Sequence, residues 1–183
     1  SDILKGMYLL AEGKGGKKAP RVQLMGSGTI LREVIAAAEL LDQDFGVASD
    51  VWSCPSFTEL RRDGMEAARW NLLHPEAAPR VPHIAKCLDK RVGPAVVATD
   101  YMRIFAEQVR PYVDRRYTVL GTDGFGRSDT REQLRRFFEV NRFYVVVAAL
   151  KALADEGTIP AVTVTQAIRK YQIDPEKAAP WRV

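Results

Sequence analysis

The chain has 183 residues, of which 46% are hydrophobic and 27% charged, and its formal net charge is +4. A globular chain of this length buries roughly 70% of its unfolded surface, so the sequence predicts a single domain over residues 1–183. No stretch approaches the ~18 consecutive apolar residues of a membrane-spanning helix, so we expect no membrane contact. The 27 basic and 23 acidic residues are largely interspersed, so the small positive excess predicts no nucleic-acid partner.

Three short features bear on location and partners. Residues 1–6 show no basic segment followed by an apolar run, so we see no secretory leader and expect a cytoplasmic location. Cys54 and Cys87 lie outside any Cys-x-x-Cys or Cys/His metal spacing and are expected to be reduced, mostly buried thiols. The lysine-rich residues 14–18, flanked by glycine and proline, predict an exposed hairpin tip, and the absence of aromatic neighbours argues against nucleic-acid binding there.

Hydrophobic periodicity and turn residues divide the chain into strands and helices. In chain order the patterns predict strand 6–10, strand 21–25, helix 29–46, strand 47–54, helix 56–71, short helix 83–90, strand 95–99, helix 100–109, strand 117–121, helix 129–138, helix 143–157 and helix 164–171.

Capping residues indicate where several of these helices begin. Residues 56–59 and 129–132 each read as a capping box, in which a side chain at either end satisfies a free backbone amide. Asp100 is expected to cap the helix that follows it, with Met102 and Phe105 among the residues that face inward.

The alternation of strands and helices predicts an α/β fold. We expect a three-layer, doubly wound sheet of about five mostly parallel strands, with one edge strand antiparallel, and a loosely packed tail at residues 175–183. Ligands of such sheets bind beyond the carboxyl ends of the strands. The glycine-rich turns at residues 26–29 and 121–128 would both lie there if their strands run parallel.

The first of these turns is a candidate anion site. Ser27, Gly28 and Thr29 follow a strand and open a helix, so free amides and the positive helix end could hold a phosphate or a carboxylate. A tight structural turn capped by Ser27 or Thr29 is the alternative interpretation. A dinucleotide site is not indicated, because the third glycine and the acidic residue of that fingerprint are lacking.

The second turn superficially resembles a magnesium–diphosphate element. Residues 121–124 and Asn141 share the composition of a Gly-Asp-Gly...Asn pattern, but the spacing is wrong and a lone carboxylate is a poor magnesium site. We therefore interpret the glycines as structural, with Phe125 filling an interior or an interface. The two histidines, His74 and His83, have no evident nucleophile or carboxylate set beside them, so we predict structural or exposed roles.

Six stretches of the chain look like successive signatures of one enzyme family. They are residues 22–32, 57–60, 69–75, 98–102, 105–110 and 121–129. Together they resemble the C-terminal domain of the homodimeric, thiamine-diphosphate-dependent pyruvate dehydrogenases, the first components of pyruvate dehydrogenase complexes. The similarity is collinear from about residue 5 to residue 174. The more distant transketolases share the Gly-Ser and Phe-Gly elements but lack the motifs at 70–75 and 123–129.

This resemblance implies a transketolase C-terminal-domain-like fold and a role within a larger enzyme. Thiamine diphosphate and magnesium would be bound by two preceding domains across a dimer interface, and this chain would hold no catalytic, cofactor or metal-binding residue. The implied activity of the intact enzyme is oxidative decarboxylation of pyruvate with reductive acetylation of lipoyl groups. Implied partners are the other domains, a second copy of the polypeptide, and the dihydrolipoyl acyltransferase and dihydrolipoyl dehydrogenase components. The chain alone would be inactive and would contribute dimer and interdomain packing.

Two alternatives remain open at this point. The chain could be a stand-alone α/β enzyme with a phosphate site at residues 27–29. It could also be a docking module that binds another subunit through the proline-rich crossing at residues 74–82 or through the basic loop at residues 14–18.

Overall fold

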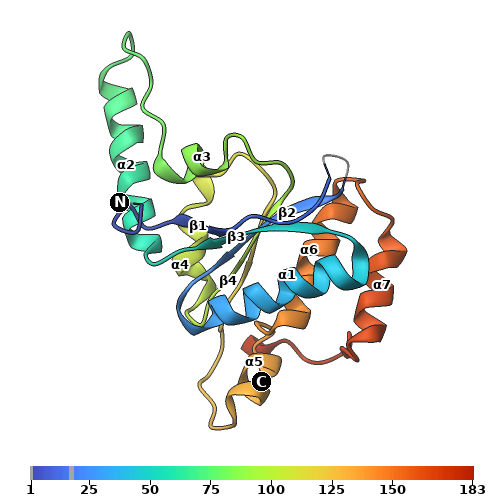
Figure 1. The fold of residues 1–183 in the computed structure, drawn as a ribbon. Helices are drawn as coiled ribbons and strands as arrows, with labels where there is room; N and C mark the ends of the chain where they lie inside the picture. Colours follow the sequence, from blue (N-terminus) through green and yellow to red (C-terminus); the bar gives the residue numbers. More distant parts are fainter. Residues whose placement is uncertain (1, 17–18) are drawn as a thin grey trace.

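The computed structural model describes residues 2–16 and 19–183, and its centre is a five-stranded sheet in the order β1-β3-β2-β4-β5 (Figure 1). β1 pairs antiparallel with β3 at one edge, and the remaining pairs are parallel. The strands are β1 (Tyr8–Ala11), β2 (Arg21–Gly26), β3 (Ala48–Ser53), β4 (Ala95–Ala98) and β5 (Tyr117–Leu120). The predicted α/β class, with one antiparallel edge strand, is confirmed.

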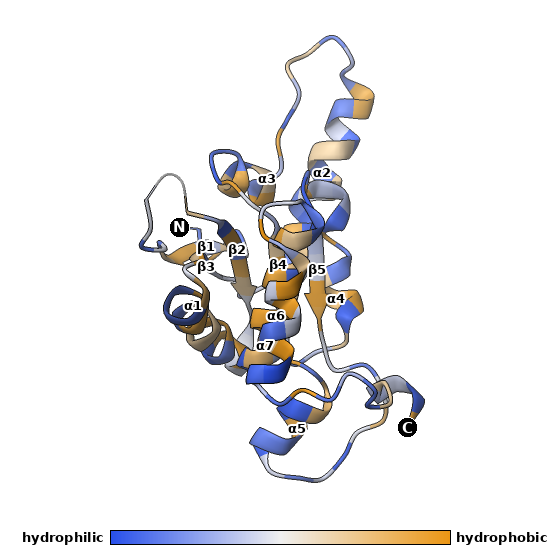
Figure 2. Cartoon of the chain, turned by 90° about the vertical axis from the view of Figure 1, so that its right-hand side faces the viewer, coloured by the Kyte–Doolittle hydropathy of each residue, from blue (hydrophilic) through white to orange (hydrophobic). Residues whose placement is uncertain are grey.

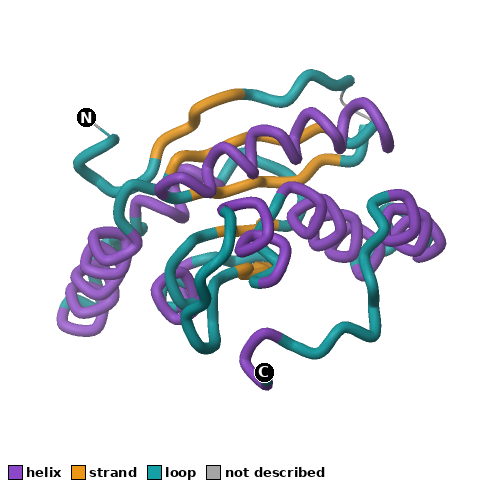
Figure 3. The backbone as a smooth tube through the Cα atoms, turned by 90° about the horizontal axis from the view of Figure 1, so that it is seen from below, coloured by secondary structure: helices purple, strands orange, loops and turns teal. Residues whose placement is uncertain are grey.

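Helices cover both faces of this sheet, as Figures 1 and 3 show. They are α1 (Leu31–Phe45), α2 (Phe57–Leu73), α3 (His83–Leu88), α4 (Arg103–Glu107), α5 (Arg131–Phe137), α6 (Arg142–Asp155) and α7 (Ala161–Lys170), with short 3-10 turns at Gly28–Ile30, Arg110–Tyr112 and Pro180–Arg182. α1, α6 and α7 pack on one face, and α2, α3 and α4 contribute to the core on the other. α2 extends away from the body of the molecule (Figure 1).

Successive side chains of the strands point to opposite faces of the sheet, and this creates two hydrophobic cores. Leu24 of β2 faces the layer of α1 and α6, whereas its neighbour Met25 faces the layer of α2 and α3. Val96 and Val97 of β4 divide in the same way, since successive side chains of a strand point to opposite faces. Figure 2 shows hydrophobic residues along β4 and β5, whereas α1 and α2 combine hydrophobic and hydrophilic residues.

A buried polar network ties the loop after β1 to the sheet. The Asp50 carboxylate, which is 0% exposed, accepts hydrogen bonds from the Gly13 amide at 3.0 Å and from the side chains of Arg21 and Gln23. Gln23 in turn accepts the indole N–H of Trp52 at 2.9 Å. Each buried polar group of this network therefore has a partner. In the basic loop at residues 14–18, Lys14 is exposed, and residues 17–18 lie outside the described part of the chain.

The beginning of α4 differs from the prediction. α4 begins at Arg103 rather than after Asp100, because the Asp123 carboxylate accepts the Arg103 amide at 3.1 Å and thereby caps the helix from a different loop. Met102 and Phe105 are consequently exposed, so the prediction that they face inward was wrong.

Several other local predictions can be compared with the structure. α5 is capped by the Thr130 hydroxyl, which accepts the Gln133 amide, so Asp129 is not the cap. Of the capping box predicted at residues 56–59, only the Ser56 half forms. The Ser56 hydroxyl accepts the Glu59 amide, whereas the Ser56 amide donates to the Gly6 carbonyl. The 175–183 tail, expected to be loosely packed, includes the buried Pro180 and a hydrogen bond from the Lys177 side chain to the Phe137 carbonyl at the end of α5.

Candidate functional site

The carboxyl ends of β2, β4 and β5 lie at one edge of the sheet and bring three loops together. The Ser27 hydroxyl, after β2, donates to the Thr99 hydroxyl, after β4, at 2.8 Å. Thr122, after β5, donates to the backbone carbonyl of Asp100 at 2.8 Å. The two glycine-rich turns therefore lie together at the carboxyl edge of the sheet, as expected for parallel strands.

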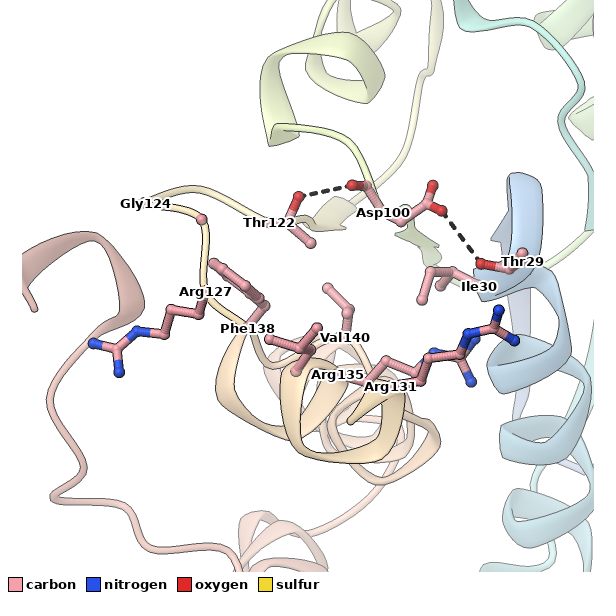
Figure 4. Close-up of a pocket in the computed structure, with 12 residues that line it drawn as sticks. Thr29, Ile30, Asp100, Thr122, Gly124, Arg127, Arg131, Arg135, Phe138 and Val140 are labelled. Atoms are coloured by element: carbon pink, nitrogen blue, oxygen red, sulfur yellow. Dashed lines mark hydrogen bonds between the residues drawn. The ribbon is translucent and has the colours of Figure 1, made fainter. Parts of the chain in front are cut away.

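Asp100 occupies the space beside the predicted anion site. The Thr29 hydroxyl donates to its carboxylate at 3.3 Å, and a Cβ built on Gly28 would lie 3.2 Å from one carboxylate oxygen (Figure 4). Ser27 is buried, and its hydroxyl is used in the hydrogen bond to Thr99 that joins the loops after β2 and β4. Anion binding by Ser27, Gly28 and Thr29 stays a prediction, and the charge of Asp100 opposes it.

The turn after β5 is shaped by close backbone contacts. Gly124 has a φ of +121°, and a Cβ there would lie 2.5 Å from the Pro180 carbonyl oxygen, so glycine is required for the tail to approach. Phe125 is 84% exposed. It does not fill the interior of this chain, and the interface alternative remains.

The residues that superficially resembled a magnesium–diphosphate element have structural partners instead. The Asp123 carboxylate caps α4 and lies 3.5 Å from the guanidinium of Arg103. The Asn141 side chain caps α6 by accepting the Tyr144 amide at 3.1 Å. Within the described residues no three His, Cys, Asp or Glu side chains are grouped as metal ligands. These positions do not fit a thiamine diphosphate–magnesium site.

A cavity of about 390 Å³ opens beside these loops, between α1 and α5. Its lining residues are Thr29, Ile30, Asp100, Thr122, Gly124, Gly126, Arg127, Arg131, Leu134, Arg135, Phe138 and Val140. In Figure 4, Arg131 and Arg135 extend toward the beginning of α1, whereas Arg127 points to the opposite side. Arginines on an amphipathic helix normally indicate a solvated or salt-bridged face, so the sequence singled out neither Arg131 nor Arg135 as a binding residue.

A buried carboxylate joins α1 to α5 and α6 next to this cavity. Glu33 of α1 is only 5% exposed, although it is charged. It pairs with Arg135 at 3.1 Å and with Arg142 through both the guanidinium and the backbone amide. Burial would raise the pKa of Glu33, but the hydrogen bonds from Arg142 and the charges of both arginines outweigh it and lower this pKa below its usual 4.5.

The lowered pKa predicts a loss of stability in acid. Because the folded-state pKa of Glu33 lies below the unfolded value, its contribution is complete above the unfolded pKa and disappears as the pH falls through the folded one. We expect Glu33→Gln to lower the free energy of unfolding by about 1–3 kcal/mol at neutral pH. Urea unfolding from about pH 7 to about pH 3 should show the two proteins converging in acid. A difference that does not change with pH would contradict this assignment.

The remaining chemically reactive side chains have structural surroundings. His83 is buried, with Nε2 2.9 Å from the Met7 carbonyl oxygen and 3.5 Å from the Cys87 Sγ, so the expectation that no nucleophile lies beside it was wrong. His74 is exposed and stacks on Trp70 at 4.5 Å between ring centroids. Burial raises the pKa of both cysteine thiols, strongly so for Cys54, which disfavours the reactive thiolate. No helix in the described ranges is long and apolar enough to cross a membrane.

The fold and the site at the carboxyl edge define a doubly wound α/β domain of the transketolase C-terminal type. The transketolase-like TK C-terminal domain family model matches residues 6–141, and the chain belongs to this family. The structure of a transketolase from Pichia stipitis in complex with sedoheptulose-7-phosphate superposes with a TM-score of 0.54, covering 84% of this chain and 18% of that one. At 18% identity this likeness concerns the fold alone.

Curated relatives are much more similar in sequence. The pyruvate dehydrogenase E1 component of Cupriavidus necator is 62% identical over 182 residues, and that of Pseudomonas aeruginosa is 59% identical over 179. These matches cover 100% and 97% of this chain, which spans about one fifth of the length of each relative. The resemblance that the motifs indicated is confirmed.

Proposed function

We propose that this chain is the C-terminal domain of a pyruvate dehydrogenase E1 component and serves that enzyme by packing against its other domains. The observation that carries the proposal is the 62% identity to the Cupriavidus necator E1 component, which extends over the whole chain. Residues 1–183 would form one domain of that larger polypeptide. The intact enzyme would decarboxylate pyruvate and transfer the acetyl group to lipoyl groups.

The chemistry would reside on the other four fifths of the polypeptide. Thiamine diphosphate and magnesium would be held there, since Asp123 and Asn141 are used here as helix caps. The family resemblance implies the same assignment, since no catalytic residue of that family would fall on this chain. Alone, the chain would not decarboxylate pyruvate.

Exposed apolar side chains supply a surface for such packing. Tyr101, Met102, Ile104 and Phe105 lie on and before α4, and each is more than 40% exposed. Phe125 is exposed in the turn after β5. Exposed clusters of large apolar side chains commonly mark surfaces that another protein unit covers. A homodimer in the cytoplasm, associated with dihydrolipoyl acyltransferase and dihydrolipoyl dehydrogenase components, would follow from membership of that enzyme.

Domain replacement tests this proposal. Substituting this chain for the matching fifth of the Cupriavidus necator E1 component should give an active chimera, because the two sequences are similar enough to present equivalent packing surfaces.

A further inference from the structure

The cavity between α1 and α5 has an excess of positive charge. Three arginines line it, namely Arg127, Arg131 and Arg135, against the single carboxylate of Asp100. Arg135 is paired with Glu33, but Glu33 is also neutralised by Arg142. Arg131 has no ion pair within residues 2–16 and 19–183. Positive charge is thus left over at the end of the cavity that lies nearest α1.

Hydroxyl groups accompany these cations on the cavity wall. Thr29 and Thr122 both line it, and Figure 4 places Thr29 at the same end as the side chains of Arg131 and Arg135. The hydroxyls of Thr29 and Thr122 already donate to the carboxylate and to the backbone carbonyl of Asp100. The guanidinium groups of Arg131 and Arg135 are therefore the hydrogen-bond donors available to a carboxylate or a phosphate.

The other part of the lining is apolar. Ile30 and Val140 are 1% exposed, Phe138 is 8% exposed, and Leu134 completes the surface. A volume of about 390 Å³ and a few polar groups over an apolar lining are typical of small-molecule sites, which range over about 300–1,000 Å³. The lining therefore favours a ligand with an anionic head and a compact apolar body over a bare inorganic ion.

We propose that this cavity binds a small organic anion, with its carboxylate or phosphate head at Arg131 and Arg135 and its apolar body against Ile30, Leu134, Phe138 and Val140. This site shares Thr29 and Asp100 with the loop at residues 27–29, but its cationic donors come from α5 rather than from the amides of that loop. The inference goes beyond the proposed function and does not depend on it, since every group involved lies on this chain.

Titration with four probe molecules tests the proposal on the 183-residue chain. Phenyl phosphate and benzoate carry both parts of the expected ligand, inorganic phosphate carries only the head, and phenol carries only the ring. We expect saturable backbone NMR shifts around the cavity with at least one of phenyl phosphate and benzoate, and the tighter of the two identifies the preferred head. Inorganic phosphate and phenol should each bind about tenfold more weakly or not at all.

Two substitutions with opposite expected effects on affinity test where the anionic head of the ligand binds. Arg131→Met should weaken binding about tenfold or more, because it removes a charged hydrogen-bond donor. Asp100→Asn should tighten binding about threefold, because it removes the carboxylate that repels the anion while keeping the side-chain shape. Arg61→Met, which removes an exposed arginine of α2 outside this cavity, is the matched control and should leave the affinity unchanged.

Three results would overturn the proposal. They are the absence of saturable binding by both phenyl phosphate and benzoate, equal affinity for inorganic phosphate alone, and equal effects of Arg131→Met and Arg61→Met. Each would leave the E1 assignment untouched, since that assignment is tested by domain replacement. The folded state of every variant is checked by its NMR spectrum without ligand.

Discussion

Replacing Asp50 by alanine is expected to lower the free energy of unfolding by about 3–5 kcal/mol, because removal of one partner of a buried ion pair leaves the other uncompensated. Asp50 is completely buried and accepts bonds from the Gly13 amide, Arg21 and Gln23. Its loss would leave the buried Gln23 amide and the largely buried guanidinium of Arg21 without this acceptor. Urea unfolding followed by tryptophan fluorescence measures the change, since Trp52 is bonded to Gln23.

An exposed carboxylate provides the control for this experiment. Asp155 pairs with Lys151 at the surface, so Asp155→Ala should change the free energy of unfolding far less than Asp50→Ala does. Similar losses for Asp50→Ala and Asp155→Ala would show that the buried network contributes no more than a surface ion pair. That result would contradict the role given to Asp50.

Gly93→Ala is expected to destabilise the protein by about 3 kcal/mol or more, through a backbone clash added to backbone strain. Gly93 has a φ of +88°, and a Cβ there would lie 1.8 Å from the Arg21 carbonyl oxygen. Relief requires movement of the beginning of β2, where the amide of Gln23 bonds to the Pro94 carbonyl. The midpoint of urea unfolding should fall accordingly.

Gly157→Ala separates the two contributions. Gly157 has a similar φ of +72°, but no atom lies within 4 Å of the position that a Cβ would take, so only the backbone strain of about 1 kcal/mol remains. The difference between the two alanine variants measures the clash at Arg21. Equal destabilisation by both would indicate that the loop at Gly93 relaxes without disturbing β2.

Much of the fold was predictable because local patterns and tertiary packing agree. The helical spacing of apolar residues after Thr29 and the stop at Gly46 predicted α1, which ends with Gly46 in the left-handed conformation. The length of the segment favoured the predicted helix over residues 143–157 over a strand, despite its valines, and α6 (Arg142–Asp155) confirms a helix there. The cap of α4 could not be predicted from the neighbouring sequence, because its acceptor, Asp123, is 20 residues away from the Arg103 amide.

The candidate site was less predictable for the same reason. A charged residue such as Glu33 is normally exposed on a helix, and it is buried here only because its partners arrive 102 and 109 residues later in the chain. Arg131 likewise meets Thr29 and Asp100 only through the order of the strands in the sheet. The meeting of the two glycine-rich turns could be predicted, because parallel strands bring their carboxyl ends to one edge.

The most direct test of the central claim is the activity of the Cupriavidus necator E1 component in which this chain replaces the matching fifth. The chimera should release carbon dioxide from pyruvate at a rate of the same order as the parent enzyme, while this chain alone and the parent truncated before that fifth should be inactive. A chimera that folds and forms the parent's oligomer but has no activity would contradict the account. Release of carbon dioxide by this chain alone would contradict it equally.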